Sequence, residues 1–152
     1  METQIAVSLQ GFIPVRKDPY EPSEMITQVL FGEYFDITDD EGKWIYIKMH
    51  KDGYEGWVDK KCIETINEPV DPQYIVYKNN LSLKNVSNGD TAIAAIGASL
   101  PSIEEKKFKI GNYEFELDDT SKILKPGTHG NLDHAIKEVR SLPYLWGGRS
   151  GF

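Results

Sequence analysis

Apolar and polar residues alternate in short stretches along most of the chain, and turn-forming residues separate these stretches. A period of two is typical of β-strands, because successive side chains of a strand point to opposite faces. In the first part of the chain the stretches lie at residues 4–9, 13–16, 26–31, 33–38, 43–49 and 55–59. This spacing predicts a small antiparallel barrel.

The stretch WIYIKM at residues 44–49 shows the alternation most clearly. One face of the expected strand carries Trp44, Tyr46 and Lys48, and the other carries Ile45, Ile47 and Met49. Both faces are therefore occupied, as in a small barrel. Residues 39–42 (DDEG) and the Asp-Gly pair at 52–53 predict hairpin turns, since Gly and Asp tolerate positive φ angles.

Residues 67–72 (NEPVDP) interrupt this pattern with two prolines and two acids. Proline cannot donate to a strand ladder and restricts the preceding residue, so we expect a linker at 68–72. A second strand-rich block follows at residues 73–77, 91–101 and 106–117, with Gly111 and Asn112 as the turn of a hairpin. The sequence therefore predicts two β-barrels of similar size, at residues 1–67 and 73–127.

The tail, residues 128–152, has a different pattern. Leu132, Ile136 and Val139 are spaced as on one face of a helix, with Asn131 as its N-cap. The helix must end before Pro143, which disfavours helical geometry at the preceding residue. Because the tail offers this apolar face nothing to pack against, we expect a loosely held stub of a further domain.

The charge distribution narrows the possible partners. The formal net charge is −7, with 13 acidic and 7 basic residues at 1–67 and seven of each at 72–127. Without a basic stripe that could follow phosphates, nucleic acid is not expected as a partner. No apolar run approaches the ~18 residues of a membrane helix, so no membrane partner is expected either. The single cysteine leaves no internal disulfide.

Several short motifs follow one another across residues 13–66 in the order typical of bacterial SH3 domains. They are Val15-Arg16, Ser23-Glu24, the LFGE step at 30–33, Trp44 and the GWV triplet at 56–58. Each motif is weak alone, but the ordered set resembles the bacterial SH3 (SH3b) family.

A further motif lies in the tail sequence LPYLWGGRSGF. Pro143, Tyr144, Trp146, Gly147 and Gly148 are similar to the segment that opens the catalytic domain of NlpC-family cysteine peptidases. Two SH3-like modules ahead of it resemble the γ-D-glutamyl-L-diamino-acid endopeptidases, which cut cell-wall peptides. The resemblance implies an all-β fold of two small SH3-like barrels in tandem, followed by the helical stub of a truncated α+β peptidase domain at 128–152.

The catalytic cysteine and histidine of that family would lie beyond the end of this chain. Cys62 ends the first expected barrel, where a small buried hydrophobe fits, and His50, His129 and His134 precede the family's base. We therefore expect an accessory, substrate-positioning part of a cell-wall peptide hydrolase, inactive by itself, with no catalytic residue, cofactor or metal site. The alternative is a stand-alone module that binds cell-wall peptide without catalysis.

The resemblance implies that Tyr144 and Trp146 line a substrate cleft; core packing at the end of the helix is the alternative. An aromatic pair suits a cleft because each ring combines an apolar face with a polar atom.

The resemblance also implies that Glu24 and Tyr54 bind a free α-amine, that of the N-terminal L-Ala of a murein peptide. An ammonium ion is bound well by a carboxylate and a phenol oxygen. Glu33 and Glu55 are rival acids, and an exposed turn acid with a surface tyrosine is the alternative interpretation. The protein would meet this peptide in the cytoplasm if Met1 is the native start, and in the cell envelope otherwise.

Overall fold

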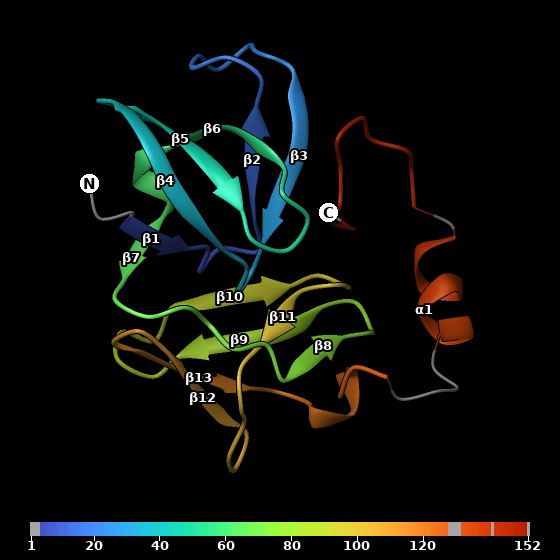
Figure 1. Cartoon of the computed structure of the whole chain (residues 1–152). Coiled ribbons are helices and arrows are strands. Elements are labelled where there is room, and N and C mark those ends of the chain that lie inside the picture. The colour runs from blue at the N-terminus through green and yellow to red at the C-terminus, as the bar shows by residue number, and fades with distance from the viewer. Residues whose placement is uncertain (1–3, 128–131, 141, 152) are drawn as a thin grey trace.

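The computed structural model describes residues 4–127, 132–140 and 142–151, without the side chains at positions 132, 134 and 138 (Figure 1). The first unit contains β1 (Gln4–Val7), β2 (Phe12–Arg16), β3 (Met25–Leu30), β4 (Tyr34–Glu41), β5 (Trp44–Met49), β6 (Glu55–Asp59), the 3-10 helix η1 (Lys60–Cys62) and β7 (Glu64–Ile66). The second contains β8 (Tyr74–Val76), β9 (Leu81–Asn85), β10 (Thr91–Ala94), β11 (Ser99–Leu100), β12 (Lys107–Ile110), β13 (Tyr113–Leu117), the 3-10 helix η2 (Thr120–Lys122) and β14 (Ile123–Leu124). The helix α1 (Leu132–Val139) follows.

The first unit is one antiparallel sheet with the strand order β3-β2-β6-β5-β4-β1-β7. Its core is an apolar cluster of Ala6, Ile13, Val15, Val29, Phe35, Ile45, Ile47, Met49 and Val58. In β5, Ile45, Ile47 and Met49 are buried as the alternation predicts, and Lys48 is exposed. The hydrophobic period therefore sets which face of this strand points into the barrel.

The second unit has a four-stranded sheet, β10-β9-β13-β12, and a three-stranded sheet, β11-β8-β14. Residues 107–117 form the expected hairpin, with Gly111 at φ +56° in its turn. The all-β, SH3-like fold class is thus confirmed.

The two units share an apolar core. One cluster joins Val7, Leu30, Phe31 and Ile66 of the first unit to residues of the second. Phe31 is fully buried, and its ring lies edge-on to Phe108 and Phe115, with centroid distances of 6.2 and 5.2 Å. At Gly32 the backbones are so close that a Cβ would lie 2.0 Å from the carbonyl oxygen of Ser99. The second unit is therefore packed directly on the end of β3.

Two details differ from the sequence prediction. The strand β9 was not expected, although Leu81, Leu83 and Asn85 alternate into the core. Residues 39–41 continue β4, because Glu41 pairs with Trp44, and the turn is formed by Gly42 and Lys43. Gly42 has φ +76°, the left-handed conformation that glycine adopts without strain.

The tail returns to the first unit. Figure 1 shows the C-terminal segment beside β3, and the contacts of residues 146–151 described below join it to this strand. The expectation of a tail without a packing partner is therefore wrong for residues 146–151. The same expectation agrees better with α1, because its apolar residues Ile136 and Val139 are 50% and 41% exposed. The predicted N-cap, Asn131, lies outside the described residues.

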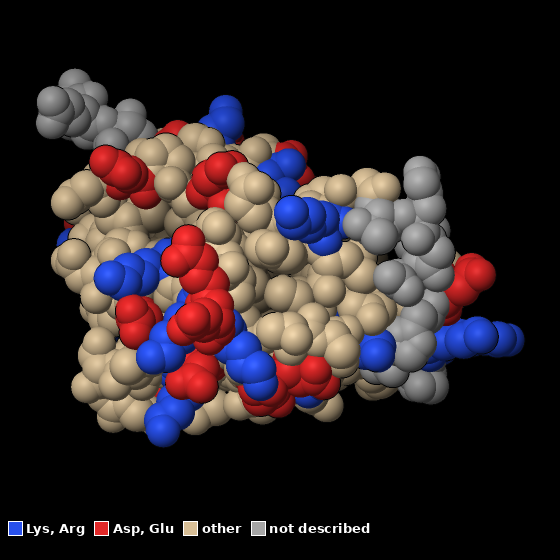
Figure 2. Space-filling model, turned by 90° about the horizontal axis from the view of Figure 1, so that it is seen from below, with Lys and Arg blue, Asp and Glu red and all other residues tan. Residues whose placement is uncertain are grey.

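The surface of the second unit carries both signs of charge. Figure 2 shows basic and acidic side chains interspersed on the face seen from below. Among the described residues, no helix is both long and apolar enough to cross a membrane.

Candidate functional site

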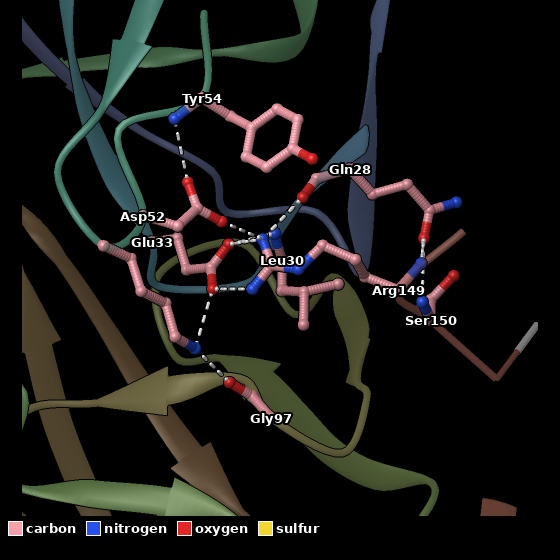
Figure 3. A network of polar contacts seen from close by, with 9 residues as sticks. Gln28, Leu30, Glu33, Asp52, Tyr54, Gly97, Arg149 and Ser150 are labelled. Carbon is pink, nitrogen blue, oxygen red and sulfur yellow. Dashed lines mark hydrogen bonds and ion pairs between the residues drawn. The ribbon is translucent and has the colours of Figure 1, made fainter. Parts of the chain in front are cut away.

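Glu33, a buried acid just after β3, is the centre of an ion-pair network (Figure 3). Its side chain is 2% exposed. Arg149 of the tail binds both carboxylate oxygens, with Nη1 to Oε2 at 2.8 Å and Nη2 to Oε1 at 2.7 Å. The backbone N–H of Leu30 also donates to Oε2, at 2.9 Å. Such a two-pronged guanidinium–carboxylate contact is both strong and directional.

Lys51 extends this network to the second unit. Its Nζ lies 2.9 Å from Oε1 of Glu33 and donates to the carbonyl oxygen of Gly97 at 2.8 Å. Asp52 balances the charge, with Oδ2 at 3.9 Å from Nη1 of Arg149. Two carboxylates and two cations thus meet where both units and the tail come together.

Gln28 of β3 holds the backbone of the tail. Its side-chain oxygen accepts hydrogen bonds from the N–H groups of Arg149 and Ser150, both at 2.7 Å. The backbone carbonyl oxygen of Gln28 accepts a hydrogen bond from Nη1 of Arg149, also at 2.7 Å. Gly147 permits this approach: it has φ +71°, and a Cβ there would lie 2.3 Å from the carbonyl oxygen of Met25.

Glu24 and Trp146, two of the predicted substrate-binding residues, lie in direct contact. Nε1 of Trp146 donates a hydrogen bond to Oε1 of Glu24 at 2.8 Å. Trp146 is 63% exposed and Tyr144 83% exposed. Neither ring packs into a core of the described residues, and their role in a substrate cleft stays a prediction.

Tyr54 is connected to the same region indirectly. It lies in the turn before β6 and is half exposed. Its backbone N–H donates to Oδ1 of Asp52 at 3.1 Å, which links the turn to the network around Arg149 (Figure 3).

A cleft of about 290 Å³ adjoins the exposed aromatic segment. Its lining comes from the end of α1, the tail and the second unit, and includes Val139, Tyr144, Arg149, Asn79 and Ile96. This volume is near the lower limit of ordinary small-ligand pockets.

The rival acids differ in accessibility. Glu33 is buried and its oxygens are taken by protein donors, so it offers nothing to a ligand. Glu55 is exposed and lies 3.2 Å from Nζ of Lys48. Of the three candidate acids, Glu24 is therefore the one that is both exposed and in contact with the tail.

Neither Cys62 nor His50 resembles a catalytic group. Cys62 is partly buried against the core of the first barrel, and this burial raises the pKa of its thiol. A thiol of raised pKa is less often the reactive thiolate. His50 stacks on Tyr34 and lies 2.9 Å from Asp36. His129 and the side chain of His134 lie outside the described residues.

No cluster of His, Cys, Asp or Glu suited to a metal ion occurs in the part of the chain that the structure describes. The sequence reasoning also missed the roles of Arg149 and Gln28. Arg149 is 116 positions from Glu33, so no local pattern indicates that they pair.

Comparison with known proteins shows what the chain resembles. Residues 15–63 match the family model of the bacterial dipeptidyl-peptidase Sh3 domain. This match covers most of the first unit and confirms its resemblance to bacterial SH3 domains.

Two longer proteins resemble the chain more widely. The γ-D-glutamyl-L-lysine dipeptidyl-peptidase of Bacillus subtilis (strain 168) is 30% identical over 142 residues, covering 83% of this chain and 48% of the relative. The chain thus spans about half the length of that protein. A solved NlpC/P60 family protein from Bacillus cereus ATCC 10987 shares the fold, with TM-score 0.76, 18% identity and coverage of 97% of this chain and 67% of the other. The chain therefore resembles the tandem SH3 region and first catalytic-domain residues of NlpC-family cysteine peptidases.

Proposed function

We propose that this chain positions cell-wall peptides for a hydrolase of the γ-D-glutamyl-L-diamino-acid endopeptidase type. In this proposal Glu24 binds the free α-amine of the peptide, and Tyr144 and Trp146 contact its apolar surface. The supporting observation is the hydrogen bond from Trp146 to Glu24, at 2.8 Å. It joins the acid of the first unit to the aromatic segment of the tail.

The chemistry of Glu24 suits an ammonium ligand. An ionised carboxylate has about four acceptor sites on its two oxygens. One of them takes the indole N–H, and the remaining sites can accept from an ammonium ion. The indole fixes the orientation of the carboxylate, which lowers the cost of ordering it on binding. The exposed position of Glu24 permits ligand access.

The name of the relative supports a free N-terminus as the recognised feature. A dipeptidyl-peptidase releases two residues from the N-terminus, so it must distinguish a free amine from a continuing chain. For this protein we therefore propose a ligand of the type L-Ala-γ-D-Glu-L-Lys, with Lys standing for the diamino acid.

An NMR titration tests the proposal. Protein 1–152 labelled with ¹⁵N has three tryptophans, each with one indole N–H signal, and Trp146→Phe identifies the signal of Trp146. Adding L-Ala-γ-D-Glu-L-Lys should shift the Trp146 signal saturably and leave that of Trp44, which is 7% exposed, in place.

The matched control ligand is the same peptide with its amine acetylated. A hydrogen bond to a charged group contributes about 1.5–3 kcal/mol, so this peptide should bind about 10- to 150-fold more weakly. Equal binding of the two peptides, or shifts confined to other regions, would contradict the proposal.

A further inference from the structure

The contact between Trp146 and Glu24 cannot hold the tail in place by itself. Both side chains are exposed, and an exposed hydrogen bond competes with water. The neighbouring Tyr144 is 83% exposed, so its ring adds little packing. Another part of the tail must therefore fix the position of this segment on the first unit.

That part lies three residues further along the chain. We infer that Glu33 is a positioning residue, which anchors the tail through Arg149 so that Trp146 meets Glu24. Only the consequence for ligand binding rests on the proposed function, because the anchoring can be measured without a ligand.

The burial of Glu33 makes it the dominant contact of the tail. An isolated carboxylate with 2% exposure would be strongly unfavourable. Its two oxygens instead receive three donors from Arg149 and Leu30, and Lys51 lies at 2.9 Å. Detaching the tail removes two of these donors from a buried carboxylate and leaves Lys51 and the N–H of Leu30 to compensate it, so detachment is costly.

Two neighbouring contacts convert this pair into a defined geometry. Gln28 accepts hydrogen bonds from two successive tail N–H groups, which fixes the register of the tail against β3. Gly147 lets the tail backbone approach that of Met25. Trp146 precedes this close approach directly, so its direction follows from the anchored segment.

Lys51 gives Glu33 a second connection. The same ammonium group contacts Glu33 and the carbonyl oxygen of Gly97. The position of the tail is thereby tied to the second unit as well as to the first. One buried carboxylate thus links the three parts that surround the candidate site.

The experiment uses protein 1–152 without ligand. Arg149→Gln removes the tail's cation but leaves Glu33 paired with Lys51, so the barrel should stay folded. Hydrogen exchange of the Ser150 amide should become at least about tenfold faster, and the indole signal of Trp146 should move to the position of a free tryptophan.

Lys48→Gln is the matched control, because it also removes one cation, from the exposed pair with Glu55. It should leave both readouts unchanged. Arg149→Lys keeps the charge but loses the two-pronged contact, so it should restore part of the protection that Arg149→Gln removes. Unchanged signals of Trp44 and Trp57 show that the first barrel is folded in each variant.

Glu33→Gln changes the other partner of the ion pair by removing the carboxylate charge. It should release the tail as Arg149→Gln does. If this variant unfolds, the Arg149 variants decide. An unchanged Trp146 signal and unchanged Ser150 exchange in folded Arg149→Gln would overturn the inference.

Ligand titration separates this inference from the proposed function. If Arg149→Gln releases the tail and wild type still does not distinguish free from acetylated peptide, the anchor stands and the proposed function fails. If wild type distinguishes the peptides and Arg149→Gln leaves the tail in place, the proposed function stands and the anchor fails.

Discussion

Phe31→Ala should destabilise the second unit, although Phe31 belongs to the first. The side chain is fully buried against Phe108 and Phe115. Truncation of a buried phenylalanine costs about 3–5 kcal/mol, from lost apolar burial and from the cavity left behind. This loss is a large part of the usual 5–15 kcal/mol stability of a domain. Residues 1–67 and 73–127 should therefore not behave as independent domains.

Phe35→Ala is the matched control. Phe35 is also fully buried, but it lies in the core of the first barrel. Both variants remove the same group, so they differ only in the core that they disturb.

Urea unfolding monitored through methyl NMR signals gives a separate unfolding midpoint for each unit. Ile45 and Val58 report on the first unit, and Leu83 and Leu117 on the second. In Phe31→Ala, the midpoints from Leu83 and Leu117 should fall at least as far as those of the first unit. If only the first-unit signals move, Phe31 is not part of a shared core and the reasoning is refuted.

Three further outcomes are expected. Gly147→Ala should detach the tail, seen as faster amide exchange at Ser150, because Cβ would collide with the backbone of Met25; Gly42→Ala, with equally positive φ but open space, should leave the tail unchanged. Burial tends to raise the pKa of Asp59, but the N–H and charge of Lys61 outweigh it and lower this pKa overall. The resulting stability is present above about pH 4 and lost as pH falls through the folded-state pKa, so Asp59→Asn should show a smaller drop in urea midpoint from pH 7 to pH 3. Protein 1–152 should release no lysine from L-Ala-γ-D-Glu-L-Lys by mass spectrometry, and release that persists in Cys62→Ser would contradict the expectation that this chain is inactive by itself.

The strands of the first unit could be predicted because each one buries a face. Ile45, Ile47 and Met49 have the period that a half-buried strand requires, and the structure buries them. The strand β9 buries Leu81, Leu83 and Asn85 with the same period, but it was missed because it is short and only its two leucines are apolar.

Long-range contacts could not be predicted in this way. Phe31 ends an apolar run, and nothing local says which unit buries it. The pairing of Glu33 with Arg149 depends on two elements meeting in space, and local periodicity carries no information about such a meeting. Glu24 and Trp146 could be named as site residues only through the family resemblance. Their direct contact emerged from the structure.

The recognition of a free amine is tested most directly by isothermal titration calorimetry of Glu24→Gln. Glutamine keeps an oxygen that can accept from Trp146 but removes the charge, so the site should keep its shape. In wild type, acetylated L-Ala-γ-D-Glu-L-Lys should bind about 10- to 150-fold more weakly than the free amine. In Glu24→Gln this ratio should fall close to one, and Tyr54→Phe should reduce it less, since it removes one uncharged acceptor and leaves the carboxylate charge of Glu24 in place.

Glu55→Gln, which removes the rival exposed acid, should retain the wild-type ratio, and thermal melts must show each variant folded. If Glu24→Gln keeps the wild-type preference for the free amine, the carboxylate that binds the peptide is not Glu24, and the central claim is contradicted.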